Sequence, residues 1–218
     1  MSSFDRGVAF IFEGTTERVF YQSILEHYVS KHDGFTLTKE ADSSNNDYRQ
    51  ILSNGNLNII IKTFTVGTII ASTQVSANWF RNSCRQRYNQ IDWTVFLCYD
   101  TDAHNKDISQ FKEGDWKHLK NNIRRNKRTH IIDLAASADI EDIMLYDLAG
   151  ICKFLGISLC SMPSGRKGKS KIKKIFRENG STYHEGERAK ALIDPLEKDI
   201  IIRDSSVPFH EIDNIFFK

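Results

Sequence analysis

The stretch Gly7–Tyr28 (GVAFIFEGTTERVFYQSILEHY) decides the fold that we expect for this chain. It begins with a short apolar run of β-forming residues, GVAFIF, and the Glu13-Gly14 pair that follows is a turn signal. Apolar residues then recur every three or four positions, which predicts a helix capped by Thr15 or Thr16. The stretch therefore predicts a strand, a tight turn and a helix, which is the repeating unit of an α/β fold.

The alternation of strands and helices continues along the chain. Further strands are predicted at Phe35–Lys39, Leu57–Lys62, Trp93–Tyr99 and Thr129–Leu134, and helices at Ile69–Tyr88, Phe111–Arg128 and Ala135–Leu155. Ala41–Asn58 is rich in Ser, Asn, Asp and Gly, which predicts a loop. This order is typical of a mostly parallel sheet with right-handed crossovers and flanking helices.

The composition changes at Ser161. We therefore expect residues 1–160 to form the α/β domain and residues 161–218 to form a small basic C-terminal extension packed on it. Within the extension, the pattern predicts a linker at Met162–Gly165, a helix at Glu187–Glu197, a short strand at Asp199–Arg203 and an aromatic tail.

The overall composition limits the class of protein. The 218 residues are 40% hydrophobic and 27% charged with a net charge of +2, which excludes a low-complexity chain and says little about partners. The four cysteines have no CxxC spacing, so neither a zinc knuckle nor a redox pair is expected; Cys98 and Cys152 fit buried positions. No signal peptide or membrane span is predicted, and we expect a cytoplasmic protein.

Acidic residues follow three of the predicted strands. They are Glu13 and Glu17, then Asp100 and Asp102, then Asp139, Glu141 and Asp142. Because the carboxyl ends of parallel strands meet at one edge of a sheet, we expect these side chains to converge on a Mg²⁺ or Mn²⁺ site. Each group alone also has a simpler explanation, as a helix cap, a favourable charge in a first helical turn, or an Asx turn.

The sequence FEGTTE at residues 12–17, followed by YDTD at residues 99–102, resembles the Toprim superfamily. That superfamily spans topoisomerases, primases, ribonuclease M5 and the overcoming-lysogenization-defect (OLD) nucleases. The Glu-Gly-x-Thr-Glu form is similar to the OLD and RloB-like branch, which is associated with bacterial phage defence. The resemblance covers about residues 7–156 and implies a compact Toprim-like α/β fold.

The resemblance also implies phosphodiester chemistry that depends on a divalent metal. By position, Glu13 would be the acid–base or metal-linked glutamate, Asp100 and Asp102 the metal aspartates, and Glu17 a further catalytic acid. Glu141 and Asp142 are expected as additional ligands, although the pattern does not fix which residue of the Asp139–Asp142 group faces the site. The chain has no GxxxxGK[ST] phosphate loop, so an ATPase, if required, would be a separate chain.

Basic residues form three segments that could contact phosphates. Arg81, Arg85 and Arg87 precede the two longer runs, Trp116–Arg128 and Gly165–Arg177, which contain no acidic residue. The predicted nucleic-acid contacts are Arg124, Arg125, Arg166, Lys167, Lys169, Lys171 and Lys173. Lysine-rich helix faces are also common as plain solvated surfaces.

Together these features predict a Mg²⁺- or Mn²⁺-dependent nuclease that hydrolyses RNA or DNA, as an effector of bacterial anti-phage defence by abortive infection. The expected partners are nucleic acid and a separate ATPase or sensor protein. The alternative is a non-catalytic Toprim-fold subunit that binds nucleic acid or a partner in a defence complex. In that alternative, the tail residues Phe209, Ile212, Ile215 and Phe216 dock on another protein.

Overall fold

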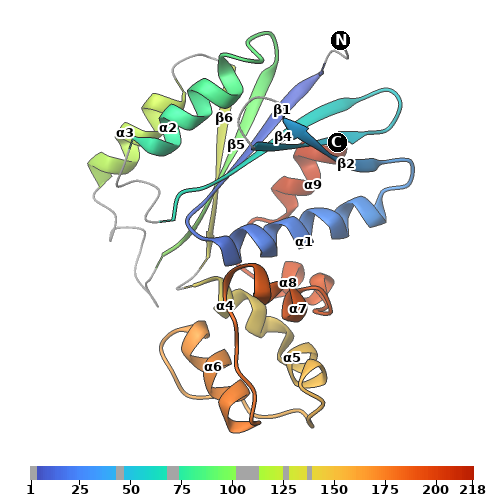
Figure 1. The fold of residues 1–218 in the computed structure, drawn as a ribbon, viewed down its shortest axis with the longest axis vertical. Coiled ribbons are helices and arrows are strands. Elements are labelled where there is room, and N and C mark those ends of the chain that lie inside the picture. Colours follow the sequence, from blue (N-terminus) through green and yellow to red (C-terminus); the bar gives the residue numbers. More distant parts are fainter. Residues whose placement is uncertain (1–3, 43–46, 68–73, 102–112, 125–127, 137–138) are drawn as a thin grey trace.

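The computed structural model describes residues 4–42, 47–67, 74–101, 113–124, 128–136 and 139–218. Strands in this part of the chain form one sheet in the order β2-β3-β4-β1-β5-β6 (Figure 1). The strands are β1 (Arg6–Phe12), β2 (Thr36–Asp42), β3 (Asp47–Ser53), β4 (Asn58–Thr65), β5 (Asp92–Asp100) and β6 (Thr129–Ala136). The pairs β1–β4, β1–β5 and β5–β6 are parallel, while β3 runs opposite to its neighbours. The predicted α/β class, with a mostly parallel sheet, is confirmed.

The central strands β1 and β5 position the carboxyl edge of the sheet. Every residue of β1 after Arg6 is buried, because helices cover both of its faces. Phe12 at the end of β1 pairs with Cys98 of β5, and Asp100 at the end of β5 pairs with Ala136 of β6. The chain segments that follow these three strands therefore leave the sheet at the same edge.

Strand β3 lies where the composition predicts a loop. It pairs antiparallel with both β2 and β4, and it buries Gln50 and Leu52 while Arg49 and Ile51 stay partly exposed. Polar residues can occupy such a strand because cross-strand pairing, rather than intrinsic propensity, holds it in place. The predicted loop over Ala41–Asn58 is therefore wrong.

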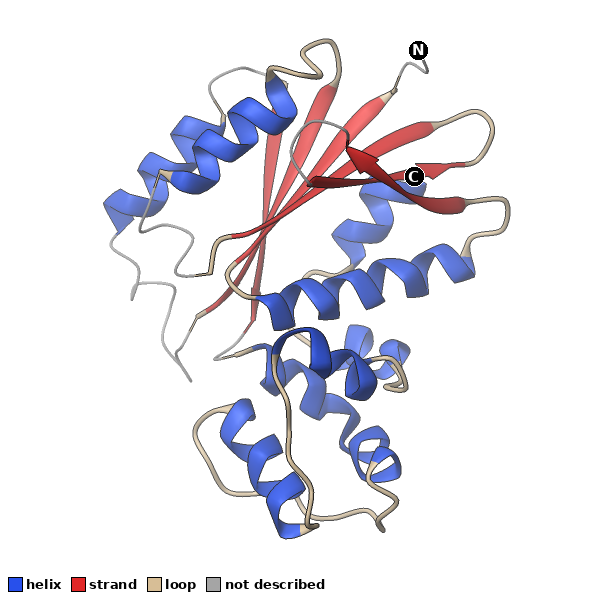
Figure 2. Cartoon of the chain, in the orientation of Figure 1, coloured by secondary structure: helices blue, strands red, loops and turns tan. Residues whose placement is uncertain are grey.

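Helices cover both faces of the sheet and its carboxyl edge (Figures 1 and 2). Helices α1 and α9 pack on one face, while α2, the π-helix η2 and α3 pack on the other, and α4–α8 lie beyond the carboxyl edge. Their bounds are α1 (Thr15–Lys31), α2 (Val75–Trp79), η2 (Phe80–Arg85), α3 (Glu113–Ile123), α4 (Ile140–Met144), the 3₁₀-helix η4 (Leu145–Asp147), α5 (Leu148–Phe154), α6 (Gly168–Glu178), the 3₁₀-helix η5 (Gly186–Ala189), α7 (Lys190–Ile193), α8 (Lys198–Asp204) and α9 (His210–Phe217).

Two predicted elements differ in the structure. The predicted strand at Asp199–Arg203 is part of helix α8, which buries Ile201. The single helix predicted over Ala135–Leu155 is divided into α4, η4 and α5, because Asp147 caps α5 by accepting a hydrogen bond from the amide of Gly150 at 2.9 Å.

The N-terminus of α1 is also capped differently from the prediction. Gly14 is the N-cap and contributes no side chain, so neither threonine caps the helix. The Thr16 hydroxyl instead accepts a hydrogen bond from the amide of Gly186 at 2.9 Å. This bond ties the start of α1 to a segment 170 residues later in the chain.

The C-terminal tail belongs to the main hydrophobic core. Phe209, Ile212 and Phe216 are at most 1% exposed. The Phe216 ring stacks on Phe10 of β1, with ring centroids 6.2 Å apart, and Phe209 contacts Tyr21 of α1 at 5.9 Å. Because these side chains stabilise the chain's own core, the prediction that they dock on another protein is wrong.

The cysteines are all free thiols, and Cys98 and Cys152 are buried as predicted. Among the described residues, no helix combines the length and the apolar character that crossing a membrane requires.

Candidate functional site: an acidic pocket at the carboxyl edge

A cavity of about 370 Å³ opens at the carboxyl edge of the sheet, between the start of α1, the end of β5 and the starts of α4 and α6. We call it the acidic pocket. Its charged lining residues are Glu17, Asp100, Asp139, Glu141, Glu185, Lys167 and Lys169. The carboxylates that follow three separate strands therefore meet in one place, as the parallel topology predicts.

Glu17 lies in the first turn of α1 and is only 8% exposed. Its side chain folds back over Gly14, where an added Cβ would lie 2.6 Å from Glu17 Oε2, so a larger residue there would displace the Glu17 carboxylate. Burial raises the pKa of Glu17, while hydrogen bonds with its own amide and with Asp100, together with the charge of Lys169, partly offset this effect. Glu17 is therefore a buried carboxylate next to a second one.

Asp100 is the last residue of β5. Burial, followed by the negative charges of Glu17, Glu141 and Asp139, raises the pKa of Asp100 to about 9. Its Oδ1 atom is buried and has no hydrogen-bond partner within the described part of the chain. At neutral pH and without a cation, this carboxyl group therefore keeps its proton.

Asp139 caps helix α4 and also binds helix α6. Its Oδ1 accepts a hydrogen bond from the amide of Asp142 at 3.0 Å, and its Oδ2 accepts one from the amide of Lys169 at 3.2 Å. Burial is the largest cause that raises the pKa of Asp139. Since both oxygens already accept from backbone amides, Asp139 positions the two helices around the pocket.

Glu141 is the second carboxylate that α4 contributes. It is 3% exposed, and its Oε1 accepts a hydrogen bond from the hydroxyl of Tyr183 at 2.9 Å. Burial and the charge of Asp139 raise the pKa of Glu141 to about 7, against the opposing effect of the Tyr183 hydrogen bond. Sequence reasoning missed Tyr183, because nothing in its local sequence connects it to α4.

Asp142 does not line the pocket. Its Oδ1 lies 3.0 Å from Lys171 Nζ in a partly buried ion pair. The expectation that Asp142 is a metal ligand therefore stays a prediction, and the members of the Asp139–Asp142 group that line the pocket are Asp139 and Glu141. The reason is the cap: Asp139 fixes the first turn of α4, and that turn directs Glu141 into the cavity.

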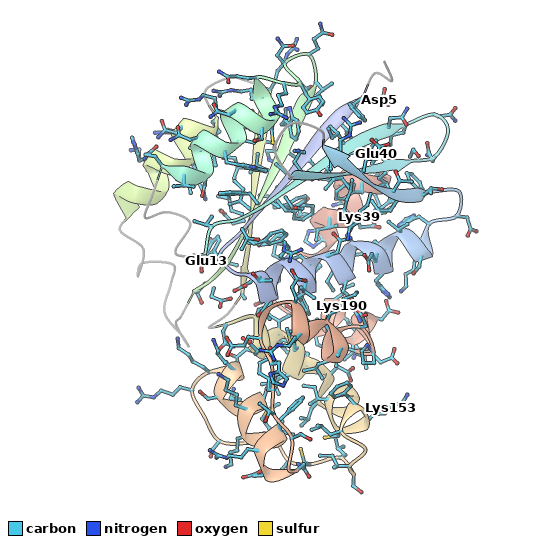
Figure 3. All side chains as sticks on the ribbon, in the orientation of Figure 1. Asp5, Glu13, Lys39, Glu40, Lys153 and Lys190 are labelled. Carbon is cyan, nitrogen blue, oxygen red and sulfur yellow. The ribbon has the colours of Figure 1, made fainter. Side chains whose placement is uncertain are left out.

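Glu13 lies beside the pocket rather than in its lining. Figure 3 labels Glu13 near the start of α1. Its side chain accepts a hydrogen bond from the amide of Asp100 at 3.3 Å, and its own amide donates to the carbonyl of Cys98 at 3.2 Å. Glu13 therefore holds the ends of β1 and β5 together and positions the backbone of Asp100. Asp102 lies outside the described residues.

Helix α6 packs its N-terminus directly against the backbone of α4. A Cβ on Gly168 would lie 2.0 Å from the Asp142 amide nitrogen and 2.4 Å from the Glu141 carbonyl carbon. Only glycine allows this approach, which brings Lys167 and Lys169 to the rim of the pocket.

The lysines of α6 are paired with carboxylates. Lys169 and Lys173 lie 2.5 Å and 2.7 Å from the carboxylate of Glu185, and Lys171 contacts Asp142. The predicted polyanion contacts along this helix are therefore engaged in intramolecular ion pairs. Arg124 and Arg166 are exposed away from the pocket lining, and Arg125 lies outside the described residues.

The donor chemistry of the pocket suits a hard divalent cation. Buried carboxylates repel one another unless protons or a cation neutralise them. Asp100 Oδ1 has no hydrogen-bond partner in the described part of the chain, so it can serve as a ligand oxygen for a cation. Within the described ranges, no three His, Cys, Asp or Glu side chains already form a ligand set for one metal ion. A cation would therefore have to draw the carboxylates closer together.

Comparisons with known proteins give no family. No family model matches the chain, and no curated protein matches it. Among solved structures, a futalosine hydrolase mutant of Helicobacter pylori strain 26695 aligns over 97% of this chain and 98% of its own, with 9% identity and a TM-score of 0.33. Helicobacter pylori MTAN aligns over 96% of this chain and 93% of its own, with 10% identity and a TM-score of 0.27.

The two solved structures named above are a futalosine hydrolase and MTAN. The prediction of an RNA- or DNA-cutting nuclease is contradicted and we withdraw it, together with its non-catalytic alternative. At these TM-scores the two structures transfer no activity to this chain.

Proposed function

We propose that the acidic pocket is the active site of a hydrolase that binds Mg²⁺ or Mn²⁺ and acts on a small phosphorylated molecule. The observation that carries this proposal is the convergence of Glu17, Asp100 and Glu141 from three distant segments, with one buried oxygen of Asp100 unpartnered in the described part of the chain. The resemblance of residues 12–17 and 99–102 to the Toprim superfamily agrees with a metal site and stays a proposal.

The cation ligands in this proposal are Glu17, Asp100 and Glu141. Asp139 is left out because both of its oxygens accept backbone amides. When bound, a divalent cation would polarise a phosphate oxygen and lower the pKa of a coordinated water. The chain's own contribution is to keep the three carboxylates buried and close together, so that a cation gains more from binding here than at the surface.

The rim of the pocket supports an anionic substrate. Lys167 and Lys169 stand on one side of the carboxylates, at the N-terminus of α6. A substrate phosphate would have to compete with Glu185 for the Lys169 ammonium on one side, and would contact the cation on the other. The cavity, at about 370 Å³, falls at the small end of ligand sites, which favours a metabolite-sized ester over a polymer.

Glu141 and Tyr183 couple cation binding to the release of a proton. Their hydrogen bond is buried, and burial with the charge of Asp139 holds the pKa of Glu141 near 7 in the cation-free protein. A bound cation would lower this pKa, so Glu141 would lose its proton when it becomes a ligand. Tyr183 orients this carboxylate and is a positioning residue in the proposal.

The test is hydrolysis of a panel of small phosphate esters by metal-stripped protein, with Mg²⁺ or Mn²⁺ then added back. We expect activity only with the cation, and its loss in Asp100→Asn and Glu17→Gln. Asp204→Asn is the matched control, because this exposed carboxylate lies on α8 and pairs with Arg203. Activity that survives a chelator, or full activity in Asp100→Asn, would contradict the proposal.

A further inference from the structure

A second pocket lies on the other face of the sheet, between α2, η2 and α3. Its volume is about 270 Å³, and its polar lining residues are Gln74, Asn78, Arg81, Arg85, His118 and Asn122. We call it the basic pocket. Among the described residues that line it, none is a carboxylate and none also lines the acidic pocket.

The π-helix η2 presents the two arginines to this pocket. Its hydrogen bonding includes the i to i+5 bond from the Gln86 amide to the Arg81 carbonyl, at 2.9 Å. Phe80 and Cys84, each next to one of the arginines, are 0% exposed in the core against the sheet. The buried side of η2 therefore anchors the backbone from which Arg81 and Arg85 extend.

Hydrogen bonds orient the polar lining. Arg81 Nε donates to the side-chain oxygen of Asn82 at 3.1 Å, which fixes the plane of the guanidinium group. Asn122 of α3 donates from its side-chain nitrogen to the side-chain oxygen of Gln74 at 2.8 Å, which joins the two walls of the pocket. The donors are thus held by the fold rather than spread along a flexible surface.

We propose that the basic pocket binds a phosphate group, with Arg81 and Arg85 donating charge-assisted hydrogen bonds to its oxygens. Guanidinium groups match the oxygens of a phosphate in pairs, and the side-chain amides of Asn78 and Asn122 supply further donors. The described lining residues offer hydrogen-bond donors and positive charge, which favours an anion over a cation. The same phosphate chemistry occurs in a free nucleotide and in a nucleic-acid strand.

The test is calorimetric titration of the metal-stripped full chain with inorganic phosphate, a nucleoside monophosphate and a short single-stranded oligonucleotide. The variant Arg81→Lys/Arg85→Lys keeps both charges and removes the paired donors. The matched control is Arg177→Lys/Arg203→Lys, since both of these arginines are exposed and outside either pocket. Asn78→Ala is a milder second variant that removes one exposed donor.

We expect the Arg81→Lys/Arg85→Lys variant to weaken phosphate-dependent binding by about tenfold, while the control changes it by less than about twofold. Weakening with phosphate and the mononucleotide identifies a free small ligand, and weakening with the oligonucleotide alone identifies a strand. Binding of none of the three probes, or equal weakening in the control, would overturn the proposal. Asp100→Asn should leave binding to the basic pocket unchanged. This result makes the test independent of whether the acidic pocket is an active site.

Discussion

The acidic pocket and the basic pocket differ in how their charges are balanced. In the acidic pocket, Glu17, Asp139 and Glu141 are at most 8% exposed, so their charges are poorly screened by water. In the basic pocket, Arg81 and Arg85 are only partly buried, so water screens their charges more than those of the carboxylates. Repulsion between the carboxylates therefore destabilises the empty acidic pocket until a cation binds. The charges of the empty basic pocket destabilise the fold much less.

The two pockets also differ in how the chain builds them. Five segments, at residues 14–17, 100, 139–141, 167–169 and 185–186, form the acidic pocket, and backbone hydrogen bonds to Asp139 and Thr16 join some of them. The basic pocket comes mainly from the local stretch of α2 and η2, with α3 as its second wall. A substitution in the acidic pocket should therefore disturb several elements, and one in the basic pocket should act locally.

The largest expected effect separates the two pockets by function. Asp100→Asn should reduce Mn²⁺ affinity and any cation-dependent hydrolysis by about 100-fold or more, because it removes a charged oxygen donor at the centre of the carboxylates. Calorimetry with Mn²⁺ and a steady-state assay measure both quantities. Unchanged Mn²⁺ affinity would show that the carboxylates are balanced by protons alone.

The free energy of unfolding should depend on whether Asp100 carries a proton. Because the folded pKa of Asp100, about 9, lies above its unfolded value, the folded state keeps a proton that the unfolded state releases. Stability of the cation-free protein should therefore fall as pH rises from about 4 to about 9. Asp100→Asn should raise Tm at pH 8 and leave it unchanged at pH 4.

Added Mg²⁺ should reverse that loss in the wild type. At about 100 times its Kd, the ion should stabilise the protein by about 2.7 kcal/mol, and each kcal/mol should raise Tm by about 2–4 °C in a chain of this length. Thermal unfolding monitored by circular dichroism measures both shifts. A Tm of Asp100→Asn that rises with Mg²⁺ as much as the wild type would argue against Asp100 as a ligand.

The contact of α6 with α4 gives a smaller effect. Gly168→Ala places a Cβ inside the backbone of α4 and should cost about 1–3 kcal/mol of unfolding free energy, while it moves Lys169 away from the acidic pocket. Ser170→Ala on the exposed side of the same helix is the control. Chemical denaturation measures the cost, and equal stability of the two variants would show that the helices do not touch so closely.

The smallest expected effect concerns Tyr183. Tyr183→Phe removes the hydrogen bond that lowers the pKa of Glu141, so this pKa should rise further by roughly half a unit to one unit, the equivalent of about 1 kcal/mol. The pH at which Mn²⁺ affinity is half-maximal should then move upward. Tyr146→Phe is the control, because Tyr146 is 44% exposed. An unchanged pH profile would mean that Glu141 does not bind the ion.

The sequence predicted the convergence of carboxylates because it rests on topology. Apolar runs such as Trp93–Tyr99 identify central strands, and parallel strands place the residues after them at one edge. The choice of Glu141 over Asp142 could not be predicted, since it depends on the cap that Asp139 provides to α4. Spacing alone does not reveal which turn of a helix faces a cavity.

The ion-pair partners of the lysines and the existence of strand β3 could also not be predicted from the sequence. Lys169 and Lys173 meet Glu185 only because the chain after α6 returns to the pocket. β3 exists because β2 and β4 both pair with it, although its residues are mostly polar. In both cases a long-range contact determines what the local pattern leaves open.

The hydrogen bond between the Gly186 amide and the Thr16 hydroxyl has a consequence for the order of events during synthesis. The carboxylates near the N-terminus leave the ribosome long before the helix that carries Lys169. A nascent or prematurely ended chain therefore lacks the wall that completes the cavity. In the proposal, activity begins only when the chain has folded through Gly186, so that shorter fragments are inert.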